Sequence, residues 1–355
     1  MTSLLERMQK SGAVKHTSVL NKSTFFNTKD SIPTEIPIIN IALSGRLDGG
    51  LTPGLTFLAG ESKSFKSLLG LMLVKAYMSK YEDAVCLFYD SEFGIPPEYI
   101  ESNGIDTSRV LHIPIEHLEQ LKFDISKRLD DIERGDKIII FIDSVGNLAS
   151  KKEVEDSLEG KSVADMSRAK VMKSLWRIVT PHLTTKDIPC VAVNHTYQTM
   201  ELYSKAIMSG GTGGMYSANQ VFVITKAQDK DGKDLMGYNF TINIEKSRFV
   251  REKSKFLFNA RFDAGINKWS GLLDIATDGG FVVKPSMGWY SKVDVTNGEV
   301  EEKKYRAKDT NTKDFWLPIL TSEPFKEYIT DRYQLANRTL VIDDIDELEE
   351  VNVDD

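Results

Sequence analysis

The chain has 355 residues, of which 41% are apolar and 27% are charged; this is typical of a globular protein with one large domain and small attachments, or with two domains. Its net charge of −7 comes from the C-terminus, because residues 343–355 hold eight Asp and Glu and no Lys or Arg. Residues 1–342 then carry 45 basic against 44 acidic side chains, so the acidic balance does not exclude DNA as a ligand.

Composition also argues against secretion and against a membrane span. Charged residues interrupt the first ten positions, unlike a signal peptide, and the longest stretch without Lys, Arg, Asp or Glu (206–225) contains four glycines. The two cysteines, Cys86 and Cys190, lie in apolar runs. We therefore expect reduced core cysteines in an intracellular protein.

In chain order, the pattern first predicts a short amphipathic helix within residues 1–12, with Leu4, Leu5 and Met8 on its apolar side. Such an arm either docks on another molecule or packs on its own core, and both remain open. Residues 36–59 read as a strand-like start, a glycine-rich turn and a second strand.

Short apolar runs rich in β-branched residues recur through the middle of the chain, separated mostly by helical segments. Such runs suit strands buried on both faces of a mainly parallel sheet. The runs are residues 55–59, 84–89, 110–113, 138–142, 189–193 and 221–224. Residues 237–262 change to alternating runs around a charged turn, which predicts an antiparallel extension at one edge.

The fold class is therefore α/β, with four predicted segments. Residues 1–35 form an N-terminal helix and arm, residues 36–270 the core, residues 271–340 a small α+β domain, and residues 341–355 an acidic disordered tail. The tail either screens a basic site or only aids solubility, and the sequence favours neither.

The stretch from Gly60 to Ser67 joins an apolar strand to a helix. Phosphate-binding loops have this layout because a bent loop and a helix N-terminus aim several backbone N–H groups at one anion. Lys66 is expected to reach the terminal phosphates and Ser67 to contact Mg²⁺. The predicted nucleotide-binding residues of the loop are Gly60, Glu61, Ser62, Lys63, Ser64, Phe65, Lys66 and Ser67.

Position 65 departs from the usual pattern G-x-x-x-x-G-K-[ST], which has glycine before the lysine. Glycine is used there for backbone freedom and close approach. Phe65 therefore means either that the loop follows a different path or that the match is accidental.

Three more polar residues follow predicted parallel strands, whose carboxyl ends meet at one edge of a sheet. Asp143 is expected to order the Mg²⁺ shell, Glu92 to accept a proton from the attacking water, and His195 to sense the γ-phosphate. Each has a plainer interpretation, as a helix cap, a surface residue and a structural histidine respectively. Their joint placement beside the phosphate loop favours the nucleotide site.

Two segments have the composition of loops that hold a polymer. Residues 147–165 are charged and poor in apolar residues, and residues 196–214 combine tyrosines, a lysine and glycines. Such loops suit single-stranded DNA, because cations neutralise phosphates and rings contact bases without sequence preference. Two ordinary surface loops are the alternative. The predicted DNA-binding residues are Arg168, Lys170, Tyr197, Lys205, Gly210 and Gly211.

A predicted strand near residue 245 ends in two cations. A period of two places Ile242, Ile244, Lys246 and Arg248 on one face. The two cations are either solvated at the strand end or meet an anion, such as a phosphate held by a neighbouring subunit.

Together these motifs resemble the RecA-type homologous recombinases over residues 30–320, most closely the phage branch of that family, which also has a bulky residue before the loop lysine. The resemblance implies a RecA-like P-loop ATPase core. It implies that Tyr99 stacks on adenine, and that His195 stands where bacterial members have glutamine. The catalytic residues that it implies are Glu92, Lys66, His195, Lys246 and Arg248.

The resemblance further implies an ATP- and Mg²⁺-dependent enzyme that forms helical filaments on single-stranded DNA and pairs it with homologous double-stranded DNA. Its implied partners are copies of itself, a single-strand-binding protein and a recombination mediator, with no membrane, in the cytoplasm of an infected bacterial host. A ring-forming DNA helicase and a nucleotide-gated single-stranded DNA coat protein are the alternatives.

Overall fold

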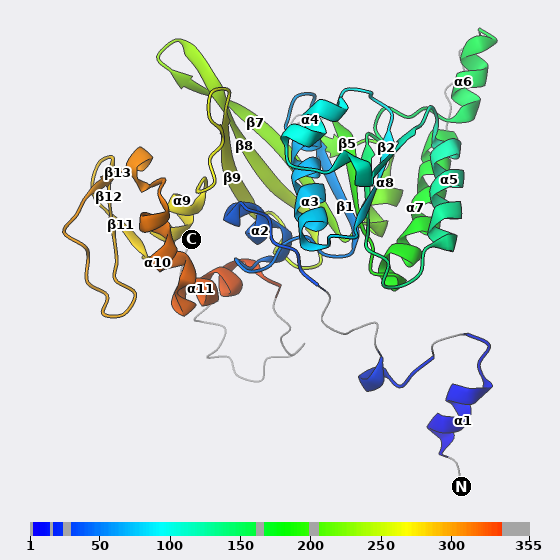
Figure 1. The fold of residues 1–355 in the computed structure, drawn as a ribbon, viewed down its shortest axis with the longest axis horizontal. Helices are drawn as coiled ribbons and strands as arrows, with labels where there is room; N and C mark the ends of the chain where they lie inside the picture. Colours follow the sequence, from blue (N-terminus) through cyan, green and yellow to red (C-terminus); the bar gives the residue numbers. More distant parts are fainter. Residues whose placement is uncertain (1–2, 15–16, 24–29, 161–166, 199–205, 336–355) are drawn as a thin grey trace.

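A large sheet, parallel over most of its strands, runs through the body of the protein (Figure 1). The computed structural model describes residues 3–14, 17–23, 30–160, 167–198 and 206–335. Within these, the strand order is β10-β9-β8-β7-β1-β5-β4-β2-β3, with β6 paired to β5 outside that path.

The parallel part lies between β7 and the edge strand β3, and the antiparallel extension lies beyond β7, as predicted. The strands of the parallel part are β1 (Gly54–Gly60), β2 (Val85–Asp90), β3 (Val110–Pro114), β4 (Ile138–Asp143), β5 (Pro189–Gln198) and β7 (Gln220–Asp231). The antiparallel strands are β6 (Ala206–Met208), β8 (Asp234–Ser247), β9 (Lys255–Arg261) and β10 (Gly265–Ile266). The sequence-based α/β class is therefore confirmed.

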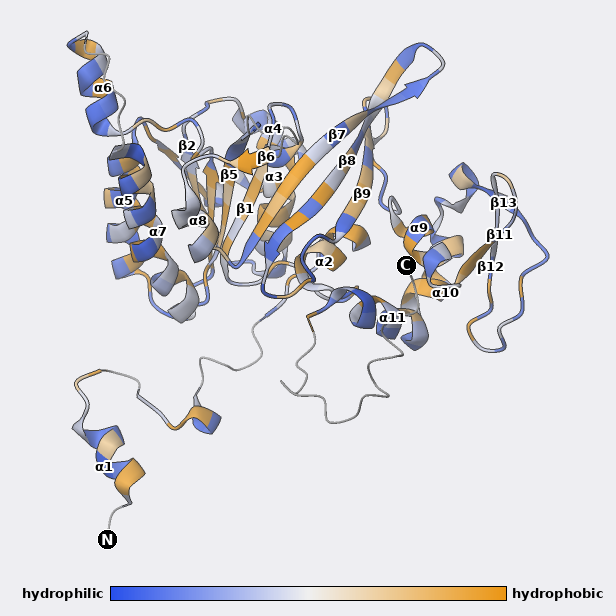
Figure 2. Ribbon diagram, turned by 180° about the vertical axis from the view of Figure 1, so that it is seen from behind, coloured by the Kyte–Doolittle hydropathy of each residue, from blue (hydrophilic) through white to orange (hydrophobic). Residues whose placement is uncertain are grey.

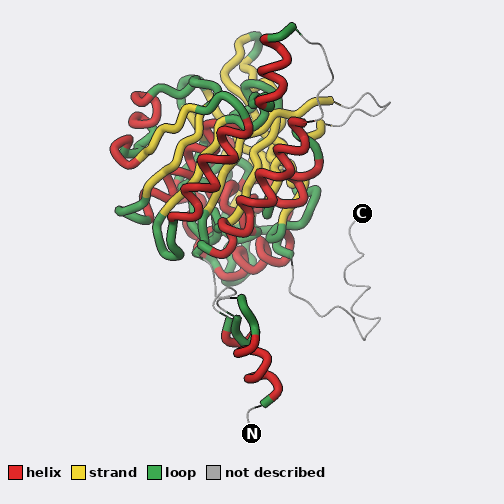
Figure 3. Tube along the Cα trace, turned by 90° about the vertical axis from the view of Figure 1, so that its right-hand side faces the viewer, coloured by secondary structure: helices red, strands yellow, loops and turns green. Residues whose placement is uncertain are grey.

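Helices cover both faces of the sheet, because its central strands are apolar on both sides (Figures 2 and 3). Alternate residues of β1 belong to different cores: Leu58 packs on one face, Phe57 and Ala59 on the other. The first face carries α2 (Pro37–Ser44), α3 (Lys66–Lys80) and α4 (Pro97–Ser102). The second face carries α5 (Leu118–Asp131), α7 (Ser167–Thr185) and α8 (Thr212–Ser217).

Residues 37–44 form a helix, so the strand-like start predicted from residue 36 is wrong. Pro37 occupies the first turn, where its missing N–H costs nothing, and Gly45 ends the helix in the left-handed region. Every residue from Ile38 to Ser44 is buried. A helix buried on all sides shows no 3.6-residue pattern, and its run of isoleucines then resembles a buried strand.

A small α+β unit follows the antiparallel extension, and its buried aromatic residues belong to the same core as α2 and α3. Three antiparallel strands form its sheet, in the order β11-β12-β13. Its elements are α9 (Leu272–Asp278), β11 (Val282–Ser286), β12 (Trp289–Lys292), β13 (Tyr305–Arg306), α10 (Lys313–Thr321) and α11 (Glu323–Tyr333). The predicted small α+β attachment is confirmed; its boundary residues stay predictions.

The N-terminal helix α1 (Leu4–Ser11) lies apart from the body (Figures 1 and 3). A capping box between Ser3 and Glu6 fixes its start. Leu4 and Met8 are 64% and 57% exposed, so the apolar side of the helix is not buried in this chain. Packing on its own core is therefore not what the structure shows. Among the described helices, none is long and apolar enough to cross a membrane.

Candidate functional site

The loop between β1 and α3 holds residue 65 in the left-handed region, with φ +71° at the N-cap of α3. This backbone region costs most residues free energy and suits glycine. In this chain the Phe65 ring packs against Phe240 at 5.0 Å and Phe258 at 5.4 Å between ring centroids. Burial of the ring on the antiparallel extension thus offsets the backbone cost.

Lys66 folds back into the loop that it follows. Its Nζ donates to the Glu61 carbonyl at 2.6 Å and to Ser64 Oγ at 3.3 Å. The side chain is buried, and desolvation lowers the pKa of its ammonium group. A second cation, Lys226 on β7, donates to the carbonyls of residues 62 and 63. Sequence reasoning missed Lys226, because only the sheet order brings β7 beside the loop.

Asp143 ends β4 and lies in register with Asp90 of β2. Its carboxyl is 2% exposed, and Oδ1 is buried without a hydrogen-bond partner. Desolvation raises the pKa of Asp143 to about 6; the nearby charges of Glu92 and Asp90 add to the rise, while a hydrogen bond from Ser67 opposes it.

Asp143 Oδ1, which has no hydrogen-bond partner, and the nearby Ser67 hydroxyl offer two oxygen ligands. Oxygen ligands suit Mg²⁺, which also keeps several waters when bound. Ser67 and Asp143 therefore fit the ion. In the described residues, no group of three or more His, Cys, Asp or Glu is arranged to bind a metal by itself. The pair suits an ion whose remaining ligands are phosphates and water.

Glu92 lies in the turn after β2 and faces the same cavity. Its Oε1 accepts from Ser144 Oγ at 2.6 Å and from Asn147 Nδ2 at 3.1 Å, and His195 Nε2 lies 3.3 Å away. The sequence did not predict that Ser144 and Asn147 contact Glu92. The signal that could have found them is their place just after Asp143, at the same sheet edge.

Lys66, Glu92 and His195 line one cavity of about 310 Å³, and Asp143 is hydrogen-bonded to its lining residue Ser67. The full lining of this cavity consists of residues 62–68, Glu92, Val193, His195 and Phe240. The structure therefore brings the predicted phosphate loop, glutamate and histidine together.

The strand that carries His195 continues into the second predicted DNA loop. His195 pairs with Gly60 in the sheet, and its carbonyl accepts from the Ser209 N–H at 2.9 Å. The Asn194 amide holds Ser209 through two more hydrogen bonds of 2.7 and 3.0 Å. Residues 196–198 pair with residues 206–208 as a hairpin. The nucleotide cavity and the base of this loop thus share one strand.

The predicted DNA-binding residues occupy different settings. Lys170 is exposed on α7, and Tyr197 is 54% exposed on β5. Gly210 and Gly211 have φ of +91° and +77°, a backbone region that favours glycine. Lys205 lies outside the described residues.

Arg168 is engaged with the main chain. Its Nε donates to the Leu148 carbonyl at 2.8 Å, and a guanidinium N–H donates to the Gly146 carbonyl at 2.9 Å. The prediction of a loop over residues 147–165 is also only partly right, because α6 (Lys151–Leu158) lies within it. A capping box between Ser150 and Glu153 starts this helix. The prediction of a loop considered the charge composition of the segment and not this capping pattern.

Lys246 does not lie on the face predicted for it. A β-bulge near residue 245 shifts the register, so Ile244 pairs with Phe222 but Lys246 pairs with Val221. Lys246 therefore points to the opposite face from Ile244, because one extra residue reverses the alternation.

On that face, Lys246 Nζ donates to the carbonyls of Met215 at 2.8 Å and Tyr216 at 3.0 Å, in the last turn of α8. Desolvation, followed by the charge of Arg248, lowers the pKa of Lys246. Arg248 itself is exposed just past the strand end.

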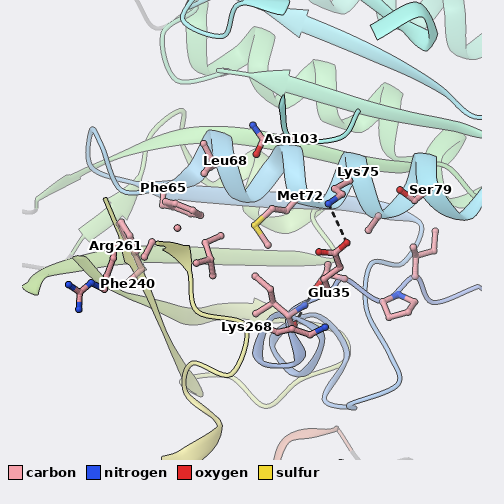
Figure 4. Close-up of a pocket in the computed structure, with 18 of the residues that line it drawn as sticks. Glu35, Phe65, Leu68, Met72, Lys75, Ser79, Asn103, Phe240, Arg261 and Lys268 are labelled. Atoms are coloured by element: carbon pink, nitrogen blue, oxygen red, sulfur yellow. Dashed lines mark hydrogen bonds and ion pairs between the residues drawn. The ribbon is translucent and has the colours of Figure 1, made fainter. Parts of the chain in front are cut away.

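An apolar groove of about 860 Å³ continues from the phosphate cavity (Figure 4). The two share Phe65, Leu68 and Phe240. Figure 4 shows Phe65 and Phe240 toward one end of the groove and an ion pair of 3.3 Å between Lys75 and Glu35 farther along it. Tyr99, 38% exposed on α4, precedes the groove residue Asn103 by one helical turn.

A strand–loop–helix join with carboxylates at the ends of other parallel strands of the same sheet is the architecture of the P-loop class of nucleotide-binding proteins. A family model described as the RecA N-terminal domain matches residues 6–267. A second, described as the C-terminal domain of the bacteriophage T4 recombination and repair protein, matches residues 269–329. The chain belongs to the RecA family of recombinases.

Its similarity to the phage branch is high. The recombination and repair protein of Enterobacteria phage T4, UvsX, is 56% identical over 355 residues, covering 98% of this chain and 91% of that protein. Protein RecA of Cutibacterium acnes is 26% identical over 270 residues, 74% of this chain and 73% of that protein. Protein RecA of Corynebacterium glutamicum strain R is 25% identical over 303 residues, 83% and 77% respectively.

The chain is thus a strand-exchange recombinase of the phage type, and neither the helicase nor the coat-protein alternative is favoured. At the level of the family, its members are DNA-dependent ATPases that generally use Mg²⁺, bind DNA and form filaments.

Proposed function

We propose that this chain hydrolyses ATP at the cavity beside α3 and couples hydrolysis to strand exchange in a helical filament on single-stranded DNA. The observation that carries the proposal is the convergence of Lys66, Glu92 and His195 on one cavity, where Asp143 is hydrogen-bonded to the lining residue Ser67. The strand that carries His195 joins this cavity to the base of a predicted DNA loop. Their positions support the proposal, because Asp143 ends β4, Glu92 follows β2, and Lys66 begins the helix that follows β1.

In this proposal the loop of residues 60–67 receives the phosphates of ATP. Lys66 exchanges its hydrogen bond to the Glu61 carbonyl for the terminal phosphates, a favourable exchange because its ammonium group is already desolvated. Ser67 would hold the ion through its hydroxyl, and Asp143 would hold it through water. Bound Mg²⁺ would neutralise charge that develops on the phosphates.

Glu92 orients the attacking water and accepts its proton. Ser144 and Asn147 donate to its Oε1 and fix the carboxylate in one position. His195, 3.3 Å from that oxygen, senses the γ-phosphate and passes the signal along β5 to the hairpin. Nucleotide state and DNA affinity are then linked reciprocally.

The groove beside Phe65 receives the rest of the nucleotide. Its apolar lining suits a base, and Tyr99 offers a half-exposed ring for stacking at the end nearest α4. Phe65 and Phe240 line both the groove and the phosphate cavity, so they adjoin the ribose region.

The neighbouring subunit completes the site. Lys246 and Arg248 of one subunit reach the phosphates bound by the next, and the exposed α1 arm docks on an adjacent copy. Lys170, Tyr197, Lys205 and the glycines at 210 and 211 contact DNA. Arg168 supports this surface by holding residues 146 and 148.

A single-strand-binding protein and a recombination mediator act beside the filament. The site of action is the cytoplasm of the infected bacterial host. Membership of the RecA family and the similarity to the phage T4 protein support both proposals.

Hydrolysis in the presence of single-stranded DNA tests the proposal. Glu92→Gln should bind ATP normally and hydrolyse it at least about 100-fold more slowly, because the base is lost and the shape is kept. The matched control is Glu116→Gln, at an exposed carboxylate away from the cavity, which should keep the wild-type rate. A wild-type rate in Glu92→Gln would show that another group activates the water.

A further inference from the structure

A second carboxylate lies directly behind Glu92, and the catalytic roles above do not use it. Asp90 ends β2, is 3% exposed, and accepts two main-chain hydrogen bonds at its Oδ1. The donors are the N–H of Glu92 at 3.0 Å and the N–H of Phe93 at 2.8 Å. One buried oxygen therefore fixes the backbone of the turn that presents Glu92.

The other oxygen of Asp90 is held from the edge of the sheet. His112 on β3 places Nε2 at 3.1 Å from Oδ2, and since a carboxylate only accepts, the imidazole is the donor. The ring also lies 5.5 Å from the ring of Phe88. His112 is 49% exposed in its side chain, on the last strand of the described sheet order.

The turn itself is under strain that this carboxylate offsets. Phe93 has φ +52° and an exposed side chain, 62% accessible, so its ring adds little packing to hold the conformation. On the far side of the turn, Ser91 Oγ donates to the Ser144 carbonyl at 2.8 Å. Asp90 ties the turn to itself and Ser91 ties it to residue 144, and Glu92 follows them directly in the chain.

We propose that Asp90 and His112 are positioning residues for Glu92: Asp90 fixes the main chain of the turn, and His112 fixes Asp90. The inference rests on the proposed role of Glu92. A catalytic base must lie within hydrogen-bond reach of its proton, and a displacement of about 1 Å costs up to about 100-fold in rate. An anchored main chain keeps the Glu92 carboxylate within that reach while Ser144 and Asn147 fix its end.

The test is steady-state ATP hydrolysis by the full-length protein on single-stranded DNA, with ATP binding measured separately. Asp90→Ala should lower kcat by at least about tenfold and change KM for ATP by less than about threefold, because the phosphate loop is untouched. Asp90→Asn, whose Oδ1 still accepts both N–H groups, should recover most of the rate. His182→Ala on α7 is the control and should keep kcat.

A double variant separates positioning from a general structural effect. If Asp90 acts only through Glu92, Asp90→Ala should slow Glu92→Gln no further than about twofold. If the two losses multiply, the positioning role is overturned. The positioning role is also overturned if Asp90→Ala has the wild-type kcat while Glu92→Gln is inactive. A wild-type rate in Glu92→Gln would instead overturn the proposed role of Glu92 as base, and this inference with it.

The edge histidine keeps the proposal testable should Asp90→Ala not fold. His112→Ala should lower kcat by about two- to fivefold, since water replaces part of the lost donor at this exposed edge. His112→Gln restores an N–H donor and should return kcat to the wild-type value. If His112→Ala has the same kcat as the wild-type protein, His112 has no positioning role. If His112→Ala and His112→Gln lose kcat equally, the role of His112 as a hydrogen-bond donor is overturned.

Discussion

Substitutions at Phe65 test the loop geometry. A glycine variant is usually less stable than an alanine variant at the same position, and at position 65 we expect the reverse order. Both Phe65→Ala and Phe65→Gly lose the ring contacts with Phe240 and Phe258. Only glycine also relieves the left-handed backbone at φ +71°. We therefore expect Phe65→Gly to be more stable than Phe65→Ala.

The magnitudes follow from two terms. Truncating a fully buried Phe to Ala costs about 3–5 kcal/mol, and because the Phe65 ring is only partly buried, about 2 kcal/mol is expected here. Relief of the left-handed conformation returns about 1 kcal/mol. Phe65→Ala should thus lose about 2 kcal/mol of unfolding free energy and Phe65→Gly about 1 kcal/mol.

Urea denaturation without nucleotide measures the difference, read from the midpoints at constant m. The matched control is Met72, one of the interior residues of α3, where Met72→Gly should be less stable than Met72→Ala by about 1 kcal/mol. If Phe65→Ala equals or exceeds Phe65→Gly in stability, residue 65 does not hold a left-handed conformation, and the account of this loop is wrong.

Two further predictions concern the phosphate site and its neighbour. The pKa of Asp143 is raised to about 6, so the carboxyl stabilises the folded chain at low pH and this contribution is lost as pH rises through about 6. Asp143→Asn should therefore stabilise the nucleotide-free chain above that pH by on the order of 2 kcal/mol, and it should abolish hydrolysis. Thermal melting of variant and wild type at pH 5 and pH 8 measures the effect. A difference in melting temperature between variant and wild type that is the same at both pH values would contradict this. Mixing Lys246→Ala with Lys66→Ala subunits should restore part of the ATPase rate, because some interfaces carry neither lesion, and no recovery at any ratio would exclude a shared site.

The parallel core, and the placement of the candidate site residues at one edge of it, could be predicted because local signals and global fold agree there. Asp143 and His195 each end a buried apolar run, and parallel strands bring such ends to one edge of the sheet. The positions of Glu92 and Lys66 follow in the same way, from a strand end and a strand-to-helix join.

The failures have physical causes that a single sequence does not display. The bulge near residue 245 moves Lys246 to the other face, and no glycine or proline marks it. Burial on all sides hides the helical period of α2. Arg168 looks like a free cation in the sequence, yet its guanidinium is used by main-chain carbonyls that only the tertiary fold brings near it.

The central claim is that ATP bound at this cavity drives strand exchange. The most direct test is joint-molecule formation between circular single-stranded DNA and linear homologous duplex, with and without ATP and Mg²⁺. Joint molecules should form with wild-type protein and ATP, should disappear without ATP, and should be absent with Lys66→Ala. Equal yields from Lys66→Ala and wild-type protein, or from reactions with and without ATP, would contradict the claim.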